Sequence, residues 1–202
     1  MTTRPYRLGR RQAAIDRTRA RILNAARALL VARDGAVFSI ESVARRARVT
    51  RATVYQRFGS RSKLLEALFD DLARRGGMGN LASAFSEADP ELALARFVAT
   101  FGRFWTAHRA IHRRLLALGA LDAGLDRTLR ARQEWRRQGL RVIVARLRER
   151  DGRTTQNEVI DLLFALTSFQ TFDVLAGPKR TPAAVAPLVL RAAQAVLGLA
   201  QR

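Results

Sequence analysis

The chain has 202 residues, of which 48 % are hydrophobic and 27 % are charged. This composition is typical of a globular protein of one or two domains. The absence of cysteine excludes disulfides, thiolate metal sites and a cysteine nucleophile. Lysine and arginine number 37 against 17 aspartate and glutamate residues, a net charge of +20. Such a charge attracts polyanions, so nucleic acid is the first expected partner and an anionic membrane the second.

The first residues do not form a secretory signal, because Arg27 interrupts the apolar stretch that follows the basic N-terminus. No apolar run approaches the ~18 residues of a membrane-spanning helix. We therefore expect a cytoplasmic protein with no membrane partner. Residues 1–14 hold four arginines among Pro5 and Gly9. We interpret them as a flexible basic arm, either a disordered tail or a segment that becomes ordered on nucleic acid.

Residues 15–74 show helical periodicity from Asp16 onward. The sequence Asp34-Gly35 is expected to end the first helix. Ser39, Thr50 and Ser60 are good helix caps, so they predict three more helices, the first two of which are very short. Residues 1–61 contain fifteen arginines against three acidic residues, which places much of the positive charge in this region.

Residues 75–202 are predicted to form a second helical domain after a glycine-containing loop between residues 74 and 88. Helix starts are expected at Asp89-Pro90, near Asp122 and at Thr181-Pro182. The predicted helices are 89–105, 110–117, 122–150, 155–176 and 181–199. Since no strand pattern competes with them, the fold is predicted to be all-α, with about nine helices.

The segment 38–65 reads FSIESVARRARVTRATVYQRFGSRSKLL. Two short helices joined by a tight turn at Arg48-Val49 are typical of a helix-turn-helix. Four apolar residues are expected to hold the two helices together: Val43, Val49, Val54 and Phe58. The outward face of the second helix is then Arg51, Ala52, Tyr55 and Gln56. A helix of this kind fits the major groove of DNA.

The chemistry of these side chains suits DNA. Arg51 can pair with guanine or grip a phosphate, Gln56 can pair with adenine, and Ala52 can touch a thymine methyl group. The hydroxyl groups of the helix suit phosphate oxygens, as does an arginine at the start of the next helix. The arginines before the turn fit a solvated surface as well as a DNA contact. The predicted DNA-binding residues are Thr50, Arg51, Ala52, Thr53, Tyr55, Gln56, Arg61, Arg45 and Lys63.

The pattern over residues 16–70, including F-S-I-E-S-V-A-R-R-A-x-V-T-x-A-T-V-Y-x-x-F-x-S-x-x-x-L, resembles the TetR family of bacterial transcription regulators. The resemblance implies a three-helix helix-turn-helix DNA-binding domain and a C-terminal domain for dimerisation and effector binding. It also implies that Tyr55 contacts phosphate and that Arg61 stands where a lysine is usual. Lys63 stands where an acidic residue is common. Arg48 occupies a position that is usually glycine, and a positive φ there would cost ~1 kcal/mol.

The helix predicted over 155–176 is apolar on almost every side, so it must be covered on two sides. Its own domain can bury one side, and a second copy of the chain is the simplest partner that could bury the other. This predicts a homodimer with a symmetric four-helix interface; a monomer whose own helices cover both sides is the alternative. The predicted interface residues are Val159, Leu163, Leu166, Leu188, Ala192 and Val196.

Aromatic residues in the middle of the chain are candidates for either a core or an effector pocket. The predicted ligand-binding residues are Phe101, Phe104, Trp105, His108, Trp135, Phe164 and Phe169. His108 and His112 have a metal-ligand spacing, but no cysteine or acid pair accompanies them, so neither a metal nor a cofactor is predicted. Arginines at 109, 113, 114, 130, 132, 136 and 137 are predicted to lie on the surface, and they leave room for an anionic effector such as an acyl thioester or an organic acid.

We conclude from the sequence that the chain is a homodimeric, ligand-responsive regulator that reads a palindromic site on double-stranded DNA. The resemblance implies a repressor; an activator or a ligand-independent regulator is the alternative. A non-specific nucleoid or membrane-surface binder is a further reading, based on charge alone. An enzyme is not favoured, because no Ser-His-acid arrangement, phosphate-binding glycine loop or paired carboxylates are found.

Overall fold

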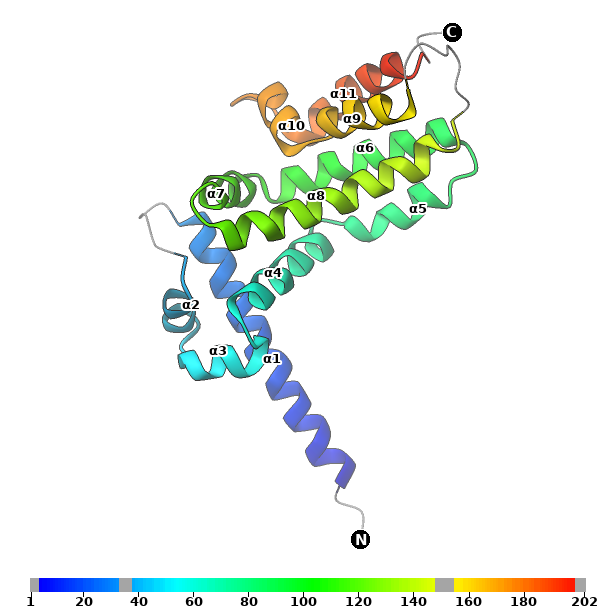
Figure 1. The fold of residues 1–202 in the computed structure, drawn as a ribbon. Coiled ribbons are helices and arrows are strands. Elements are labelled where there is room, and N and C mark those ends of the chain that lie inside the picture. Colours follow the sequence, from blue (N-terminus) through cyan, green and yellow to red (C-terminus); the bar gives the residue numbers. More distant parts are fainter. Residues whose placement is uncertain (1–3, 33–37, 148–154, 199–202) are drawn as a thin grey trace.

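The computed structural model describes residues 4–32, 38–147 and 155–198. Within these ranges the chain is all-α, with eleven α-helices, one short 3-10 helix and no β-strand (Figure 1). The N-terminal helices are α1 (Arg4–Val31), α2 (Ile40–Ala47), α3 (Arg51–Phe58) and α4 (Arg61–Arg75). The others are η1 (Met78–Asn80), α5 (Leu81–Phe85), α6 (Pro90–Ala107), α7 (Arg109–Gly119), α8 (Ala123–Val144), α9 (Gln156–Leu166), α10 (Phe169–Ala176) and α11 (Pro182–Val196).

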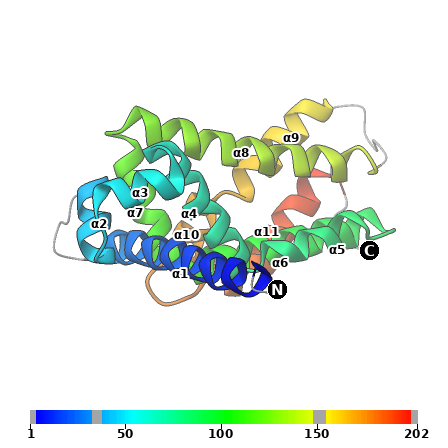
Figure 2. The ribbon, with the colours of Figure 1, turned by 90° about the horizontal axis from the view of Figure 1, so that it is seen from below.

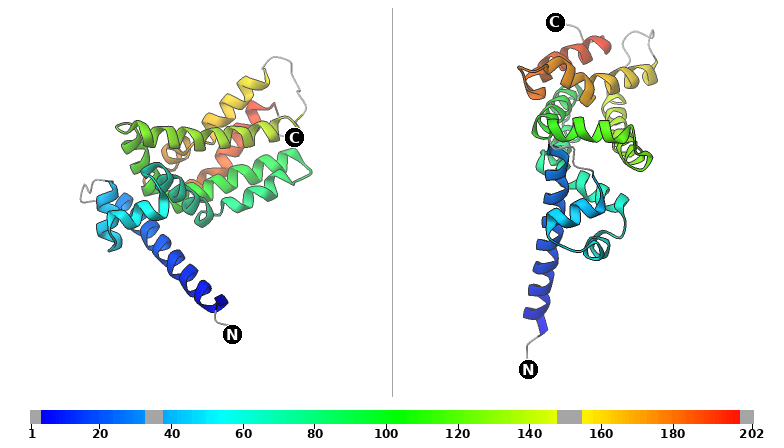
Figure 3. Two further views of the ribbon diagram at one scale, coloured as in Figure 1. Left: turned by 60° about the horizontal axis from the view of Figure 1, so that its bottom comes forward. Right: turned by 90° about the vertical axis from the view of Figure 1, so that its left-hand side faces the viewer.

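The helices are stacked in tiers, which Figure 3 shows from the side. α9, α10 and α11 form one end, α6 and α8 run beneath them, and α1 to α4 form the opposite end. Seen from below, α1, α2 and α3 lie together on the underside of the molecule, and α8 runs along one side of it (Figure 2). α3, the helix predicted to enter the major groove, therefore lies toward the end of the molecule opposite α11.

The predicted helix starts are confirmed. Ser39, Thr50 and Ser60 each accept a hydrogen bond from a backbone N–H group in the first turn of α2, α3 and α4, which satisfies donors that the helix itself cannot pair. Asp89 caps α6 and Thr181 caps α11 in the same way, each ahead of a proline in the first turn. Helix starts depend on local chemistry, so the sequence locates them well.

The basic arm predicted for residues 1–14 takes a different form from Arg4 onward, because α1 begins there and runs unbroken to Val31. Arginine is a good helix former, and Gly9 alone does not end the helix. The first turns of α1 project past α2 and α3 (Figure 1). Residues 1–3 lie outside the described residues, as do the predicted helix ends at Asp34-Gly35 and Asp151-Gly152.

Two α-helices are present beyond the nine predicted. α5 forms within the segment 74–88 that was predicted as a loop, and the helix predicted over 155–176 is divided into α9 and α10. Ser168 causes the division, since its hydroxyl accepts a hydrogen bond from the Thr171 N–H group at 3.1 Å and so starts a new helix. Such local capping by serine is hard to distinguish in an apolar sequence.

The described helices are short or polar for a membrane span. None of them, taken singly, combines the length and apolar composition that crossing a bilayer needs; α9 and α10 meet both criteria only as a pair, with a bend of 48° between them.

The N-terminal helices share a core with one buried carboxylate. Ile22, Val43 and Leu68 are almost completely buried in it. Asp71 on α4 is 3 % exposed and pairs with Arg27 of α1 at 3.4 Å and with Arg75 at 2.8 Å. Since a buried carboxylate is costly unless it is paired, this cluster fixes α4 against α1.

Candidate nucleic-acid interface

The turn between α2 and α3 has a left-handed residue at Arg48, with φ 52° and ψ 49°. It is the single non-glycine residue with positive φ among those described. The Val49 N–H group donates to the Ala44 carbonyl at 3.0 Å, which is the pattern of a Schellman helix ending. The positive φ considered from the sequence is therefore present, and arginine carries a strain there of about 1–2 kcal/mol.

α3 buries one side and exposes the other. Val54 is 1 % exposed and Phe58 is 5 % exposed, so they anchor the helix to the N-terminal core, as predicted. The four residues predicted to face outward are all exposed: Arg51, Ala52, Tyr55 and Gln56. Glu41 of α2 pairs with Arg51 at 2.9 Å. This ion pair is exposed on both sides, so it contributes little and is readily exchanged for another anion.

The predicted DNA-binding residues around α3 differ in whether their side chains are free for a contact outside the chain. Arg45 and Lys63 are exposed. The hydroxyl groups of Thr50 and Thr53 lie 2.9 Å apart, and Thr50 Oγ1 accepts from the Thr53 N–H group at 3.1 Å. The two threonines therefore hold the start of the helix in addition to any contact they make outside it.

Arg61 lies at the junction with α8 rather than on the outer face of α3. Its guanidinium group donates to Oδ2 of Asp122 at 2.5 Å. Asp122 is also the N-cap of α8, accepting from the Gly124 and Leu125 N–H groups at 3.0 Å. The hydrogen bond from Arg61, followed by that from Leu125, lowers the pKa of Asp122. The first residue of α4 is thus tied to the first turn of α8, a contact that the sequence did not reveal.

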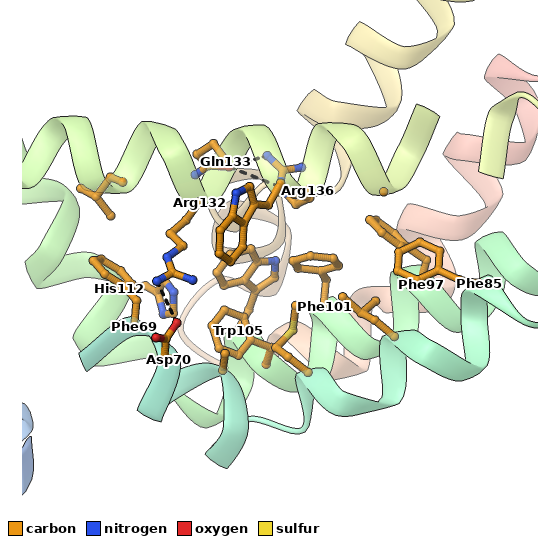
Figure 4. Close-up of a pocket in the computed structure, with 17 residues that line it drawn as sticks. Phe69, Asp70, Phe85, Phe97, Phe101, Trp105, His112, Arg132, Gln133 and Arg136 are labelled. Carbon is orange, nitrogen blue, oxygen red and sulfur yellow. Dashed lines mark hydrogen bonds and ion pairs between the residues drawn. The ribbon is translucent and has the colours of Figure 1, made fainter. Parts of the chain in front are cut away.

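A cavity of about 450 Å³ lies between α4, α6 and α8 (Figure 4). Four of the seven predicted ligand-binding residues line it: Phe101, Phe104, Trp105 and Trp135. Its size falls in the range of small-molecule sites. Further lining residues that sequence reasoning missed as ligand-binding are Phe69, Met78, Phe97, Arg132, Gln133 and Arg136. Their helical spacing resembles that of ordinary core or surface residues, so the sequence carried no distinguishing signal.

The other three predicted ligand-binding residues are not in the lining of this cavity. His108 Nε2 is 2.9 Å from the Leu72 carbonyl, where it joins α4 to the start of α7. Phe169 packs against Trp105 with ring centroids 5.6 Å apart. Phe164 lies against the guanidinium groups of Arg136 and Arg137, at 4.0 and 4.1 Å from its ring centre. These three residues build the walls behind the cavity surface.

The prediction that Arg136 lies on the surface is wrong, because this residue is 4 % exposed. It donates to the Phe164 carbonyl and to Thr167 Oγ1, both at 2.6 Å. Burial, followed by the charge of Arg137, lowers its pKa to about 9. Arg109 is also held, donating to Asp173 at 2.5 Å and to the Gly177 carbonyl at 2.7 Å. Tertiary contacts of this kind leave no local pattern.

The histidine pair is enclosed by aromatic rings rather than by further metal ligands. His112 lies 4.6 Å from the Trp105 ring and 5.0 Å from the Phe104 ring, measured between ring centres. Burial lowers its pKa to about 4. The described residues contain no group of three His, Cys, Asp or Glu side chains placed to hold a metal ion.

The residues predicted for a dimer interface lie on α9 and α11. Leu163 is completely buried in its own subunit, which removes it from any outer face. Val159, Leu166, Ala192 and Val196 are half-buried, and Leu188 is 38 % exposed. Leu162, which was not in the predicted set, is 48 % exposed. Val159, Leu162 and Leu166 are therefore among the apolar residues of α9 that keep some exposure, with Leu162 in place of the predicted Leu163.

Known proteins resemble this chain in two ways: in the sequence of its N-terminal region and in its whole fold. Residues 22–68 match the family described as bacterial regulatory proteins, tetR family. No curated protein matches the chain. Among the solved structures that share its fold at low sequence identity are three bacterial regulators.

The first is native NalD of Pseudomonas aeruginosa, described as the secondary repressor of the MexAB-OprM multidrug efflux pump, with 21 % identity and a TM-score of 0.65 over 91 % of this chain and 97 % of that one. The TetR family transcriptional regulator PfmR of Thermus thermophilus has 22 % identity and a TM-score of 0.62. The match covers 90 % of this chain and 100 % of that one. A TetR-like transcriptional regulator from a Rhodococcus species has 21 % identity and a TM-score of 0.60, over 92 % and 97 %. Residues 22–68 thus resemble the helix-turn-helix region of the TetR family, and the chain as a whole has the fold of these solved regulators.

Proposed function

We propose that the chain is a homodimeric repressor that reads a palindromic operator through α3 and releases it when a small molecule fills the cavity beside α8. The outward face of α3 carries this proposal. Arg51, Ala52, Tyr55 and Gln56 are exposed together, while Val54 and Phe58 hold the opposite side in the core. Arg51 can pair with guanine, and Gln56 can pair with adenine. Ala52 is small enough for close approach to the bases.

Dimerisation is proposed through α9 and α11, which pack side by side at the end opposite α3 (Figures 1 and 3). Leu162 and Leu188 are large apolar side chains that remain exposed on these helices. A twofold axis there would present two copies of α3 to half-sites about 34–36 Å apart or a multiple of that distance. Repression is also what the description of NalD states of that protein.

Specific reading of DNA is tested by selecting operator fragments from a genomic pool and measuring their binding in excess random DNA at two salt concentrations. A sequence reader keeps its operator under both challenges, whereas a protein that binds by charge alone loses both kinds of DNA alike. Tyr55→Phe is expected to weaken binding to every sequence, because it removes a phosphate contact. Gln56→Ala is expected to relax the preference at one base position, by about 1–3 kcal/mol. Unchanged operator affinity in both variants would contradict the groove assignment.

The dimer is tested by sedimentation of Leu188→Glu and Leu162→Glu. Each places a charge on the proposed interface and is expected to yield monomers with normal helix content. Leu121→Glu is the matched control, since Leu121 is 89 % exposed between α7 and α8, away from α9 and α11. If all three variants sediment as the unaltered chain does, the proposed interface is wrong.

A further inference from the structure

Most of the polar residues that line the cavity come from α8, beside Asp70 of α4 and His112 of α7. Arg132, Gln133 and Arg136 of α8 all line it, and the spacing of the two arginines places them one turn apart on the same face. The remaining lining is mostly aromatic and aliphatic, with Phe97, Phe101, Phe104 and Trp105 contributed by α6. A molecule that fits this space therefore has an apolar body and one polar end.

Arg136 carries a buried charge that the described part of the chain leaves without a carboxylate. Its guanidinium group donates to the Phe164 carbonyl and Thr167 Oγ1 at 2.6 Å, and to Gln133 Oε1 at 2.7 Å. These acceptors are neutral, and no ion pair of Arg136 is found among the described residues. A buried ion that lacks an opposite charge is costly, so an anion beside it gains more than it would at the surface.

Arg132 supplies a second guanidinium group at the edge of the same cavity. It reaches from α8 toward α4, where it pairs with Asp70 at 2.8 Å (Figure 4). The side chain of Asp70 is 66 % exposed, so this ion pair contributes little and can be exchanged. Arg132 also stacks on Trp135, with its guanidinium carbon 4.4 Å from the ring centre. The stacking keeps the group beside the cavity when Asp70 is displaced.

We propose that the effector of this regulator is an organic carboxylate with an apolar body, whose carboxylate lies beside Arg136 and takes Arg132 from Asp70. The inference rests on the proposed function, because it names the chemical class of the molecule that fills the cavity. Of the two arginines that line the cavity, Arg136 is the one without a carboxylate partner among the described residues, and a single negative charge matches it. The two arginines can share the two oxygens of a carboxylate in charge-assisted hydrogen bonds.

Matched acids and amides test the proposal on the full chain without DNA. Calorimetry compares 2-naphthoate with 2-naphthamide, and decanoate with decanamide, at neutral pH. At least one acid is expected to bind about tenfold or more tightly than its amide, since a hydrogen bond to a charged group is stronger than one to a neutral group. The proposal is overturned if neither acid binds or if the amides bind as tightly as the acids.

Two variants locate the charge that is responsible. Arg136→Gln is expected to remove the preference for the acid while the amide still binds, and Arg132→Gln to reduce the preference by a smaller factor. Arg130→Gln is the matched control, because Arg130 lies on the same helix with a side chain that is 78 % exposed and pairs with Asp126. Circular dichroism checks that Arg136→Gln folds; if it does not, the acid-to-amide ratio of Arg132→Gln decides. A preference that survives in the folded variants overturns the assignment to these residues.

Operator binding is measured separately on the ligand-free chain, which distinguishes the two proposals. If operator DNA is bound but no acid preference is found, the ligand class is wrong and the proposed DNA-binding function stands. If an acid binds with the expected preference but no operator is found, the proposed function fails and the cavity chemistry remains supported.

Discussion

Arg48 ends α2 in the left-handed region, where a glycine would be unstrained. Arg48→Gly is therefore expected to raise the free energy of unfolding by about 0.5–1 kcal/mol, because relief of roughly 1–2 kcal/mol of strain exceeds the entropy that glycine adds to the unfolded chain. Thermal unfolding followed by circular dichroism measures this, as a rise in Tm of about 1–4 °C for a chain of this size.

Arg46→Gly is the matched control for Arg48. It removes the same charge from an exposed residue in the same helix, but here the backbone is helical, so glycine is expected to lower the stability by about 0.5–1 kcal/mol. A fall in Tm in both variants would show that the turn at Arg48 is not strained.

His112 is a buried residue whose titration affects the stability. Burial lowers its pKa to about 4, below the value of about 6.5 in an unfolded chain. Between these two pKa values the unfolded chain binds more protons than the folded chain. The contribution of neutral His112 to the free energy of unfolding is therefore complete above about pH 6.5 and declines as the pH falls toward 4. The decline is at most about 1.4 kcal/mol per pH unit. Burial also lowers the pKa of His108, which adds a slope of the same sign.

Urea unfolding of His112→Leu at pH 7, 6 and 5 tests this titration. The variant is expected to lose less stability than the unaltered chain over that range, whatever its stability at pH 7, because one of the two buried histidines no longer takes up a proton. His108→Leu, measured alongside, gives the share of the other histidine. Parallel curves for His112→Leu and the unaltered chain would mean that His112 is not held neutral by the fold.

The break between α9 and α10 creates the binding partners of the buried arginine. Thr167 follows α9, is completely buried, and accepts from Arg136 through Oγ1 while its carbonyl accepts from Trp105 Nε1 at 3.3 Å. Thr167→Val keeps the shape but removes one acceptor from a buried charge. It is expected to lower the stability by about 1–3 kcal/mol in urea unfolding.

Thr128→Val is the control for this element. Thr128 is half-buried on α8, and its hydroxyl donates to the Gly124 carbonyl of its own helix at 3.1 Å without contacting an arginine. Its change in stability is expected to stay within about 0.5 kcal/mol. Equal losses at Thr167 and Thr128 would show that the hydrogen bond to Arg136 is not important for stability.

The helices that the sequence predicted well are those fixed by local chemistry. Thr50, Asp89 and Thr181 begin helices through hydrogen bonds to residues within three positions, and Val54 and Phe58 follow a helical period. The failures involve distant contacts. Arg136 looks like a surface residue until α9 and α10 cover it, and Arg61 finds Asp122 across 61 positions. The aromatic cavity was predicted in part, since its α6 side is periodic, whereas its charged side on α8 was not.

α4 and α8 connect the cavity to α3. α4 begins after a two-residue turn at the end of α3, and it contacts α8 through Arg61–Asp122 near its start and Asp70–Arg132 toward its end. Arg132 also lines the cavity. If an effector takes Arg132 from Asp70, α4 loses one of these two ion pairs with α8. The cavity and α3 are then coupled if the effector binds more tightly when that ion pair is open, as coupling between sites requires.

Arg61 has two possible partners, Asp122 in the free protein and a phosphate on DNA. It is the first residue of the helix that follows α3, where a helix N-terminus favours phosphate. If DNA takes Arg61 from Asp122, then Arg61→Gln weakens operator binding and reduces the salt slope by about 0.9. Asp122→Asn does the opposite, because it frees the arginine while asparagine still caps α8. It is expected to tighten binding by a factor of about 2–5, the worth of an ion pair that solvent partly screens.

Fluorescence anisotropy with the selected operator, at several salt concentrations, measures both variants. Asp126→Asn is the control for general repulsion between α8 and DNA, because Asp126 lies in the same first turn and pairs with Arg130 of its own helix. Opposite changes in Arg61→Gln and Asp122→Asn, beyond that of the control, indicate exchange of the arginine between carboxylate and phosphate. Changes of the same sign would instead mean that the ion pair stays closed on DNA and that its role is to hold α4 against α8.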